Sequence, residues 1–372
     1  MTATVGQFIR LLDDLAPPHL AESWDNVGLQ IGSRSWPVKK VWTALDPLPE
    51  VVAAAIENGV DLLVTHHPLI FKPLNRIDSD TPTGRIAEMA LAAKLAIFCA
   101  HTNLDSAAGG VNDMLAKRMA LQSPRVLDQR ADANRCKVVV FAPETHAKAI
   151  MDAVFAKGAG RIGSYSSCSF RCEGTGSFQP GEQATPAIGK VGALTEVRES
   201  RIEVPAHRDD VDRVVAAARH VHPYETMAYD VYALSGREHG VGLGRVGTLP
   251  APMALDDFSK NLKAVFNLSM VKVTGPADMP VKTVALCSGS GSGLLKSAVA
   301  SGADVYVSGD LGYHTARDAQ QAGIGLVDIG HFGSEHIVVD ALSSAIRKVI
   351  EDGGISADVE ANDMETDPFH YL

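Results

Sequence analysis

The chain has 372 residues, of which 46% are hydrophobic, enough for the buried cores of two or three domains. Its formal net charge of −10 and pI near 5.7 argue against a general nucleic-acid-binding protein, which would usually present a basic face. No apolar stretch approaches the length of a membrane-spanning helix, and five scattered cysteines form no disulfide framework, so we expect a cytoplasmic protein away from membranes.

Strand and helix patterns alternate at both ends of the chain. After an amino-terminal helix over 5–15, we predict strands at 39–45, 61–65 and 95–101, with helices at 49–59, 84–94 and 110–119. The carboxyl-terminal part repeats this pattern, with strands at 281–287, 304–308 and 325–329 and helices at 294–301, 314–322 and 334–350. The continuous apolar strands are typical of an α/β fold with a mainly parallel sheet.

The middle of the chain has a different pattern. We predict strands at 137–141, 190–194, 201–204 and 228–234, with helices at 146–157 and 210–220 and a Gly/Ser-rich stretch at 158–181. This order indicates a compact ferredoxin-like α+β sheet with helices on one face. We therefore expect an inserted domain at 134–243, joined by polar or Gly-rich connections at 125–132 and 235–247, within a discontinuous core of 1–133 and 244–372.

The two ends of the chain also match each other in detail. The sequence NGVDLLV at 58–64 is similar to SGADVYV at 301–307, and FCAH at 98–101 is similar to DIGH at 328–331. This favours a duplicated three-layer α/β core, with general likeness among βαβ units as an equal alternative. If the core is duplicated, polar residues from both halves converge in one cleft.

Three of the apolar segments are followed directly by histidine and carboxylate residues. Ligands gather beyond the carboxyl ends of parallel strands, so these residues predict a divalent-metal site. The candidate ligands are His66, His67, Asp105, His331 and Glu335. His331 and Glu335 share one face if they begin a helix. His66 and His67 would point to opposite faces of a regular strand, which either two ions or a backbone kink before Pro68 would resolve.

Mixed nitrogen and oxygen ligands suit Zn, Mn, Fe or Ni, and Zn is our first choice. Two further histidines near the same strand ends, His101 and His314, are candidates for general acid or base groups, or for residues that orient the ligands. The sequence SGSGSG at 288–293 lies between a strand and a helix, where it could either cradle an anion or form a flexible turn.

Five motifs resemble those of the Nif-three-like family, whose members are often labelled GTP cyclohydrolase type-two homologues. The motifs are ESWDNVGLQ at 22–30, VTHHPL at 64–69, HTNLD at 101–105, SGDLGYH at 308–314 and GHFGSE at 330–335. In the middle, HPYE at 222–225 and YDVY at 229–232 are similar to the PII/CutA-like insert of the longer bacterial members. Phe332 departs from the pattern, which has tyrosine there.

The resemblance implies a dinuclear centre of two divalent transition-metal ions per chain, in a toroidal homohexamer. It also implies hydrolysis of a small molecule, with the family label pointing to the ring opening of a nucleotide, GTP. We therefore expect a metal-dependent hydrolase in which His101 or His314 moves protons. The alternative is a non-catalytic metal-binding protein that acts as a regulator or scaffold.

Overall fold

The computed structural model describes residues 3–131, 135–162, 165–234 and 237–370. The chain forms two compact units, one from both of its ends (residues 1–130 and 239–372) and one from its middle (131–238). The expected connections at 125–132 and 235–247 contain the boundaries between these units, and they are strands where they are described. Residues 125–131 and 237–247 belong to strands β7 (Gln122–Ala131) and β12 (Arg237–Ala254), while residues 132, 235 and 236 lie outside the described residues.

The first core sheet confirms the predicted parallel strands. Its order is β17 (Asp358–Ala361), β4 (Lys40–Ala44), β5 (Leu62–Thr65), β6 (Ala96–Cys99) and β2 (Gly28–Ile31). Strands β17, β4, β5 and β6 run parallel, and β2 is an antiparallel edge. All residues of β5 and β6 are buried, which explains why both are uninterrupted apolar runs in the sequence.

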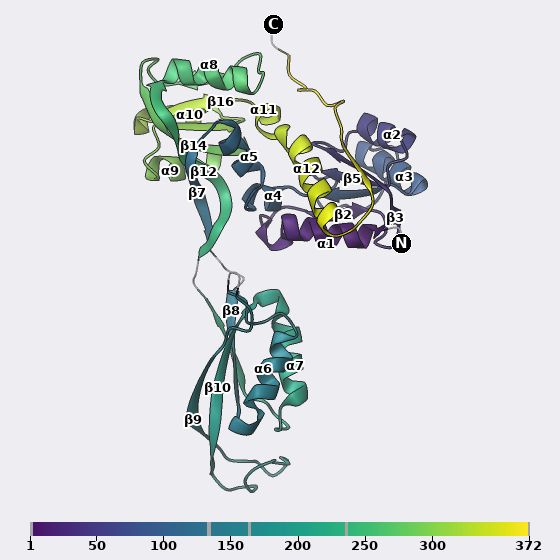
Figure 1. Cartoon of the computed structure of the whole chain (residues 1–372), viewed down its shortest axis with the longest axis vertical. Helices are drawn as coiled ribbons and strands as arrows, with labels where there is room; N and C mark the ends of the chain where they lie inside the picture. The colour runs from purple at the N-terminus through teal and green to yellow at the C-terminus, as the bar shows by residue number, and fades with distance from the viewer. Residues whose placement is uncertain (1–2, 132–134, 163–164, 235–236, 371–372) are drawn as a thin grey trace. The chain divides into compact units, whose positions relative to one another are not determined.

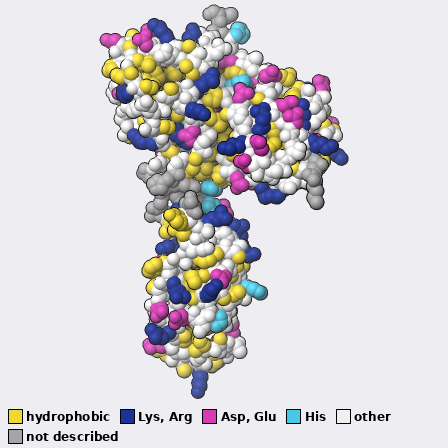
Figure 2. Space-filling model, in the orientation of Figure 1, with side chains coloured by type: hydrophobic (Ala, Val, Ile, Leu, Met, Phe, Trp, Pro, Cys, Tyr) yellow, Lys and Arg dark blue, Asp and Glu magenta, His cyan; other side chains and the backbone are white. Residues whose placement is uncertain are grey.

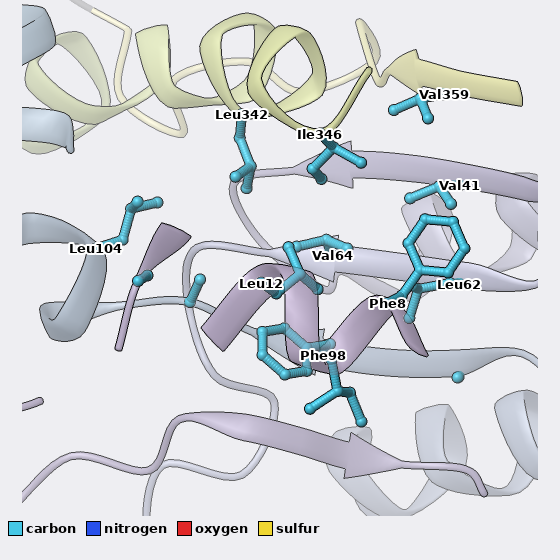
Figure 3. Close-up of a cluster of buried hydrophobic side chains, with 14 of the residues drawn as sticks. Phe8, Leu12, Val41, Leu62, Val64, Phe98, Leu104, Leu342, Ile346 and Val359 are labelled. Atoms are coloured by element: carbon cyan, nitrogen blue, oxygen red, sulfur yellow. The ribbon is translucent and has the colours of Figure 1, made fainter. Parts of the chain in front are cut away.

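Helices cover both faces of this sheet (Figure 1). Helices α1 (Val5–Leu15) and α12 (Ile337–Asp352) lie on one face, and α2 (Pro49–Glu57) and α3 (Pro82–Ala93) on the other. Side chains alternate along β5, so Leu62 and Val64 pack toward α1 and α12, as Figure 3 shows, while Leu63 packs toward α2 and α3. The result is a three-layer arrangement.

The second core sheet has the same local order. It runs β13 (Lys272–Thr274), β16 (Gly325–Asp328), β15 (Val305–Gly309), β14 (Pro280–Ser290), β12 and β7. Helices α5 (Val111–Arg118) and α8 (Leu255–Val265) pack on one face, and α9 (Leu295–Ala300) and α10 (Tyr313–Ala322) on the other. Strands β14, β15 and β16 are parallel and β13 is an antiparallel edge, just as β4, β5 and β6 are flanked by β2.

Short strands β1 (Ala3–Thr4) and β3 (Pro37–Val38) pair with each other. The described chain also has short helices α4 (Thr102–Ser106) and α11 (His331–Glu335) and 3₁₀ turns at Pro18–Leu20, Glu144–His146, Arg208–Asp210 and Ser292–Leu294. Among the described residues, no helix is both long and apolar enough to cross a membrane. On the face in Figure 2, basic and acidic side chains are interspersed, without a large area of a single charge.

The middle unit is an antiparallel sheet with two helices on one face. Its elements are β8 (Arg135–Pro143), α6 (Ala147–Phe155), β9 (Phe170–Phe178), β10 (Thr195–His207), α7 (Val211–Val221) and β11 (Tyr229–Ala233). The sheet order is β11-β8-β10-β9, and alternate residues of β8 and β10 form a core with α6 and α7. The predicted strand at 190–194 is wrong. The strand in its place, β9, is a largely exposed edge of mostly polar residues and Gly, so it lacks the apolar pattern of a buried strand.

Candidate metal centre

The titratable residues that stand out in the sequence follow the carboxyl ends of parallel strands in both core sheets. In the first sheet, β5 and β6 lead into them, the latter through the short helix α4 (Thr102–Ser106). In the second sheet, β16 leads into the short helix α11 (His331–Glu335). Strand ends of this kind are where α/β proteins gather ligands. The side chains that meet here are those of His66, His67, His101, Asp105, His331 and Glu335.

The Glu335 carboxylate lies at the centre of this cluster and is almost fully buried. Its Oε2 is 2.8 Å from Nε2 of His67 and 2.9 Å from Nε2 of His331. Its Oε1 is 3.7 Å from Nε2 of His66, which is also 3.7 Å from Oδ1 of Asp105. Because Glu335 contacts histidines from both sheets, it joins the two halves of the core at the site.

The adjacent histidines share one site because the strand ends before them. Strand β5 stops at Thr65, whose hydroxyl donates to the carbonyl of His67 at 2.8 Å. The amides of His66 and His67 donate to the carbonyls of Ala44 and Leu45 at 3.1 and 2.8 Å. Their rings lie 5.2 Å apart between centroids. The turn after β5 therefore removes the opposite-face geometry that a regular strand would impose.

Every histidine of the cluster is held at Nδ1, which leaves Nε2 to face the centre. The partners of these Nδ1 atoms are the carbonyl of Ala100 for His66 (2.9 Å), and the carboxylates of Asp46 for His67 (2.8 Å), Asp25 for His101 (2.9 Å) and Asp310 for His331 (2.7 Å). Histidines that bind metals usually have their second nitrogen held in this way, because the contact fixes both tautomer and ring orientation.

The buried Nε2 atom of His66 shows how well the cluster fits a cation. This ring is fully buried, and its Nε2 has no hydrogen-bond partner among the described residues. Leaving a buried polar atom unsatisfied costs about 1–3 kcal/mol, and a cation between the imidazole and the carboxylates would satisfy it. Three overlapping groups have ligand atoms within 4.8 Å of one another and could hold a metal ion: His66, His67 and His101; His67, His331 and Glu335; and His66, Asp105 and Glu335.

The electrostatics of the cluster favour positive charge. Burial opposes the protonation of His67, but its hydrogen bonds to Asp46 and Glu335 outweigh this effect and raise its pKa to about 10. The hydrogen bond to Glu335 is also the main reason why the pKa of His331 rises to about 9. Burial works against ionisation of Glu335 too, yet hydrogen bonds to the surrounding histidines bring its pKa well below its usual range. These carboxylates therefore stabilise cations at the site.

A close approach of β14 to Glu335 requires glycine at position 289. Gly289 has φ +57, and a Cβ atom there would lie 2.1 Å from Oε1 of Glu335. The amides of the SGSGSG segment are already engaged: Ser288 donates to Asn112, Gly289 to Ser334, and Gly291 to Ser308, at 2.9–3.0 Å. These three amides are therefore not available to cradle an anion. The segment instead packs against the cluster.

A cleft of about 1240 Å³ opens beside the cluster. His67 and His331 line this cleft, together with Asp46 and Asp310, which hold their rings. Its walls carry apolar and charged groups, including Phe332, whose ring stacks on that of His336 with centroids 4.5 Å apart. The cleft is large enough for a metabolite of nucleotide size.

Comparisons with known proteins identify the family of this chain. The family model described as Duf34/NIF3 (NGG1p interacting factor 3) matches residues 3–368. The chain belongs to this family. A relative from Halalkalibacterium halodurans and one from Bacillus subtilis, each called "GTP cyclohydrolase 1 type 2 homolog", are 40% and 39% identical over 364 and 366 residues, 98% of each chain. A solved Bacillus cereus structure described as "related to NIF3" is 38% identical over the full length of both chains, with a TM-score of 0.81.

The two predicted proton carriers lie in different surroundings. His101 belongs to the cluster, and its ring is 5.2 Å from that of His66. Its partner Asp25 also accepts hydrogen bonds from the amide and hydroxyl of Thr102, and these contacts outweigh burial to lower the pKa of Asp25 to about 2. His314 is exposed on α10 beside Tyr313 and belongs to none of the metal-binding groups among the described residues.

Sequence reasoning did not assign a role to the residues that hold the candidate ligands. These are Asp25, Asp46, Asp310 and also Ser288, whose hydroxyl donates to Asp105 at 2.8 Å. Asp25 and Asp310 lie within motifs that resemble the family, which is the one signal pointing to them. Aspartate is common in turns for purely local reasons, so its presence after a strand does not by itself indicate a contact with a distant histidine.

Proposed function

We propose that this protein is a metal-dependent hydrolase with two divalent transition-metal ions per chain. The ligands in this proposal are His66, His67, Asp105, His331 and Glu335. The observation that carries it is the convergence of histidine Nε2 atoms on two buried carboxylates, with no hydrogen bond to the Nε2 of His66 among the described residues. A cluster that served only to stabilise the fold would gain little from a buried, unsatisfied imidazole.

The number and kind of ions follow from the ligand set. His66, His67 and Glu335 each belong to two of the three overlapping groups, so the cluster offers more ligand atoms than one ion would need. Imidazole nitrogen with carboxylate oxygen suits Zn²⁺ best, with Mn, Fe and Ni as alternatives. Metal analysis of the purified protein should therefore give close to two ions per chain.

The chain's own residues would divide the chemical work between them. Bound divalent cations would supply Lewis acidity, which polarises a carbonyl or phosphoryl oxygen and acidifies water. His101 would move the proton at its Nε2, because Asp25 fixes the proton on Nδ1 and leaves Nε2 as the base. His314 stays a predicted second proton carrier.

The substrate would occupy the cleft beside His67 and His331. Lys117 and Arg118 also line the cleft, and they would be the cationic partners of an anionic molecule beyond the cluster. The names of the relatives point to GTP, and we propose hydrolysis of a C–N bond in a nucleotide or a related metabolite.

The deciding experiment measures turnover of a nucleotide and phosphoester panel by metal-loaded protein, with metal content determined in parallel. His331→Ala should lose metal and reduce the rate by orders of magnitude. His101→Ala should keep both metals and lose rate about a hundred- to ten-thousandfold, as expected for a proton carrier. His146→Ala, a partly exposed histidine of the middle unit, is the control. Metal loss in His101→Ala would make this residue a ligand.

The same experiment separates the enzyme from the alternative function. A metal-binding regulator or scaffold would retain about two ions and bind ligands, but metal-loaded wild type would turn over nothing in the panel. Rates unchanged in His331→Ala would indicate a contaminating enzyme. Full metal content in both Glu335→Ala and Asp105→Ala would overturn the ligand assignment.

We also propose that the core arose by duplication and that 134–243 is a ferredoxin-like module of the PII/CutA kind. The matching strand orders of the two core sheets support the first idea. The order β11-β8-β10-β9, with helices on one face, supports the second. A cytoplasmic homohexamer stays a prediction, which light scattering after size exclusion would test.

A further inference from the structure

The segment that follows β17 returns to the end of β4, where it binds the backbone amides of the two residues after this strand. Glu365, on this segment, is only 8% exposed. Its carboxylate accepts hydrogen bonds from the amide of Leu45 at 2.8 Å and from the amide of Asp46 at 2.7 Å. One buried side chain, more than 300 residues away in sequence, thus holds both amides.

These two amides need a partner because the sheet ends beside them. Strand β4 pairs with β17 up to Thr43 and with β5 up to Ala44. Beyond that point the carbonyls of Ala44 and Leu45 accept from the amides of His66 and His67. The amides of Leu45 and Asp46 would be left unsatisfied without Glu365. The backbone at 44–46 is therefore held from both sides.

This backbone carries the residue that orients one candidate ligand. The Asp46 carboxylate accepts from Nδ1 of His67 at 2.8 Å, and Nε2 of His67 faces Glu335 at 2.8 Å. The Asp46 side chain is 38% exposed, and its hydrogen bond to His67 requires a fixed direction. Its direction depends on the backbone from which it projects, and Glu365 fixes that backbone.

We propose that Glu365 is a positioning residue for the metal centre. It acts on His67 through the amides of Leu45 and Asp46 and through the Asp46 carboxylate. The contact is indirect but continuous, since each step is a hydrogen bond of 2.7–2.8 Å. Residues that orient metal-binding histidines typically contribute about 10- to 100-fold to metal affinity. The inference rests on the proposed metal centre.

The test titrates Co²⁺ into the full-length, chelator-treated protein and follows its visible absorption, with chelator competition giving the affinity. Glu365→Ala removes both acceptors and should weaken binding about tenfold, within the range expected for a residue behind a ligand. Glu365→Gln keeps one acceptor oxygen and should fall between wild type and Glu365→Ala. Glu360→Gln is the matched control, because Glu360 lies on β17 and contacts Lys40 and Trp42 instead.

A double-mutant cycle with Asp46→Ala separates positioning from general stability. If Glu365 acts through Asp46, the double variant should bind Co²⁺ about as weakly as Asp46→Ala alone. If Glu365 only stabilises the fold, Glu365→Ala should either lower Co²⁺ affinity by a factor that multiplies with that of Asp46→Ala, or change the free energy of unfolding without changing affinity. Either result overturns the inference. A wild type that binds no Co²⁺ would instead overturn the proposed metal centre. Should Glu365→Ala fail to fold, Glu365→Gln carries the same cycle.

Discussion

Replacing Gly289 by alanine would place a methyl group where the Glu335 carboxylate lies. The Cβ would be 2.1 Å from Oε1 of Glu335, about 1.3 Å short of ordinary contact at 3.4 Å. Strand β14 is held here by the hydrogen bond from the Gly289 amide to the Ser334 hydroxyl at 2.9 Å. We therefore expect the carboxylate to move, and with it the centre of the candidate metal site.

The free-energy cost has two parts. Holding alanine at φ +57 costs about 1–2 kcal/mol, because a Cβ crowds the backbone in the left-handed region. Moving Glu335 breaks at least one of its hydrogen bonds to His67 and His331, worth about 1.5–3 kcal/mol for charged partners. The free energy of unfolding should therefore fall by about 2.5–5 kcal/mol.

Alanine substitutions at two other glycines distinguish the backbone cost from the cost of moving Glu335. Gly302 has φ +76 with open space at its Cβ position, so Gly302→Ala should show the backbone cost alone. Gly293 lies in the same segment as Gly289, has open space and carries no left-handed backbone, so Gly293→Ala should be close to neutral. Urea denaturation of chelator-treated protein, followed by tryptophan fluorescence, measures all three. The three tryptophans are at 24, 36 and 42, so the signal reports on the core unit.

Metal binding provides the second measurement. Gly289→Ala should lower Co²⁺ affinity by at least about tenfold, as expected when a ligand loses its position. Gly302→Ala and Gly293→Ala should bind Co²⁺ like wild type. The reasoning is refuted if Gly289→Ala is no less stable than Gly302→Ala and binds Co²⁺ normally, because the carboxylate would then have room that the structure does not show.

Three further predictions concern other parts of the chain. Replacing 131–238 by a short Gly/Ser linker should leave a folded core with unchanged metal content, since that unit has its own apolar core; insoluble or metal-free protein would contradict this. Arg245→Met should lower the free energy of unfolding in urea by about 3 kcal/mol, because it leaves Asp113 without its buried partner; a change under about 1 kcal/mol would contradict this. Burial raises the pKa of the Cys99 thiol, whereas Cys172 is exposed. At pH 8, Ellman's reagent should therefore label Cys172 in the native protein and Cys99 only after unfolding. Equal labelling rates at both cysteines would contradict this.

Several elements of the core could be predicted because their burial leaves a pattern in the sequence. The strand predicted at 61–65 is β5 (Leu62–Thr65), and the one predicted at 95–101 contains β6 (Ala96–Cys99). Both are covered by helices on two faces, which requires continuous apolar residues. Strand β9 was missed because it lies at a sheet edge, where exposed polar residues and Gly serve as well as apolar residues.

The sequence by itself determined which residue types stand at the ends of the buried strands, and hence that a cluster of histidine and carboxylate was to be expected. The tertiary structure alone decided how they are held. Asp46, Asp25 and Asp310 each contact a histidine at least 21 positions away, and Glu365 contacts Leu45 across 320 positions. Local patterns record burial and backbone geometry, because these act within a few residues. The contacts of these acidic residues arise only when strands that are distant in sequence pair within a sheet, as β4 does with β5 and β15 with β16. The sequence around each acidic residue therefore does not indicate its partner.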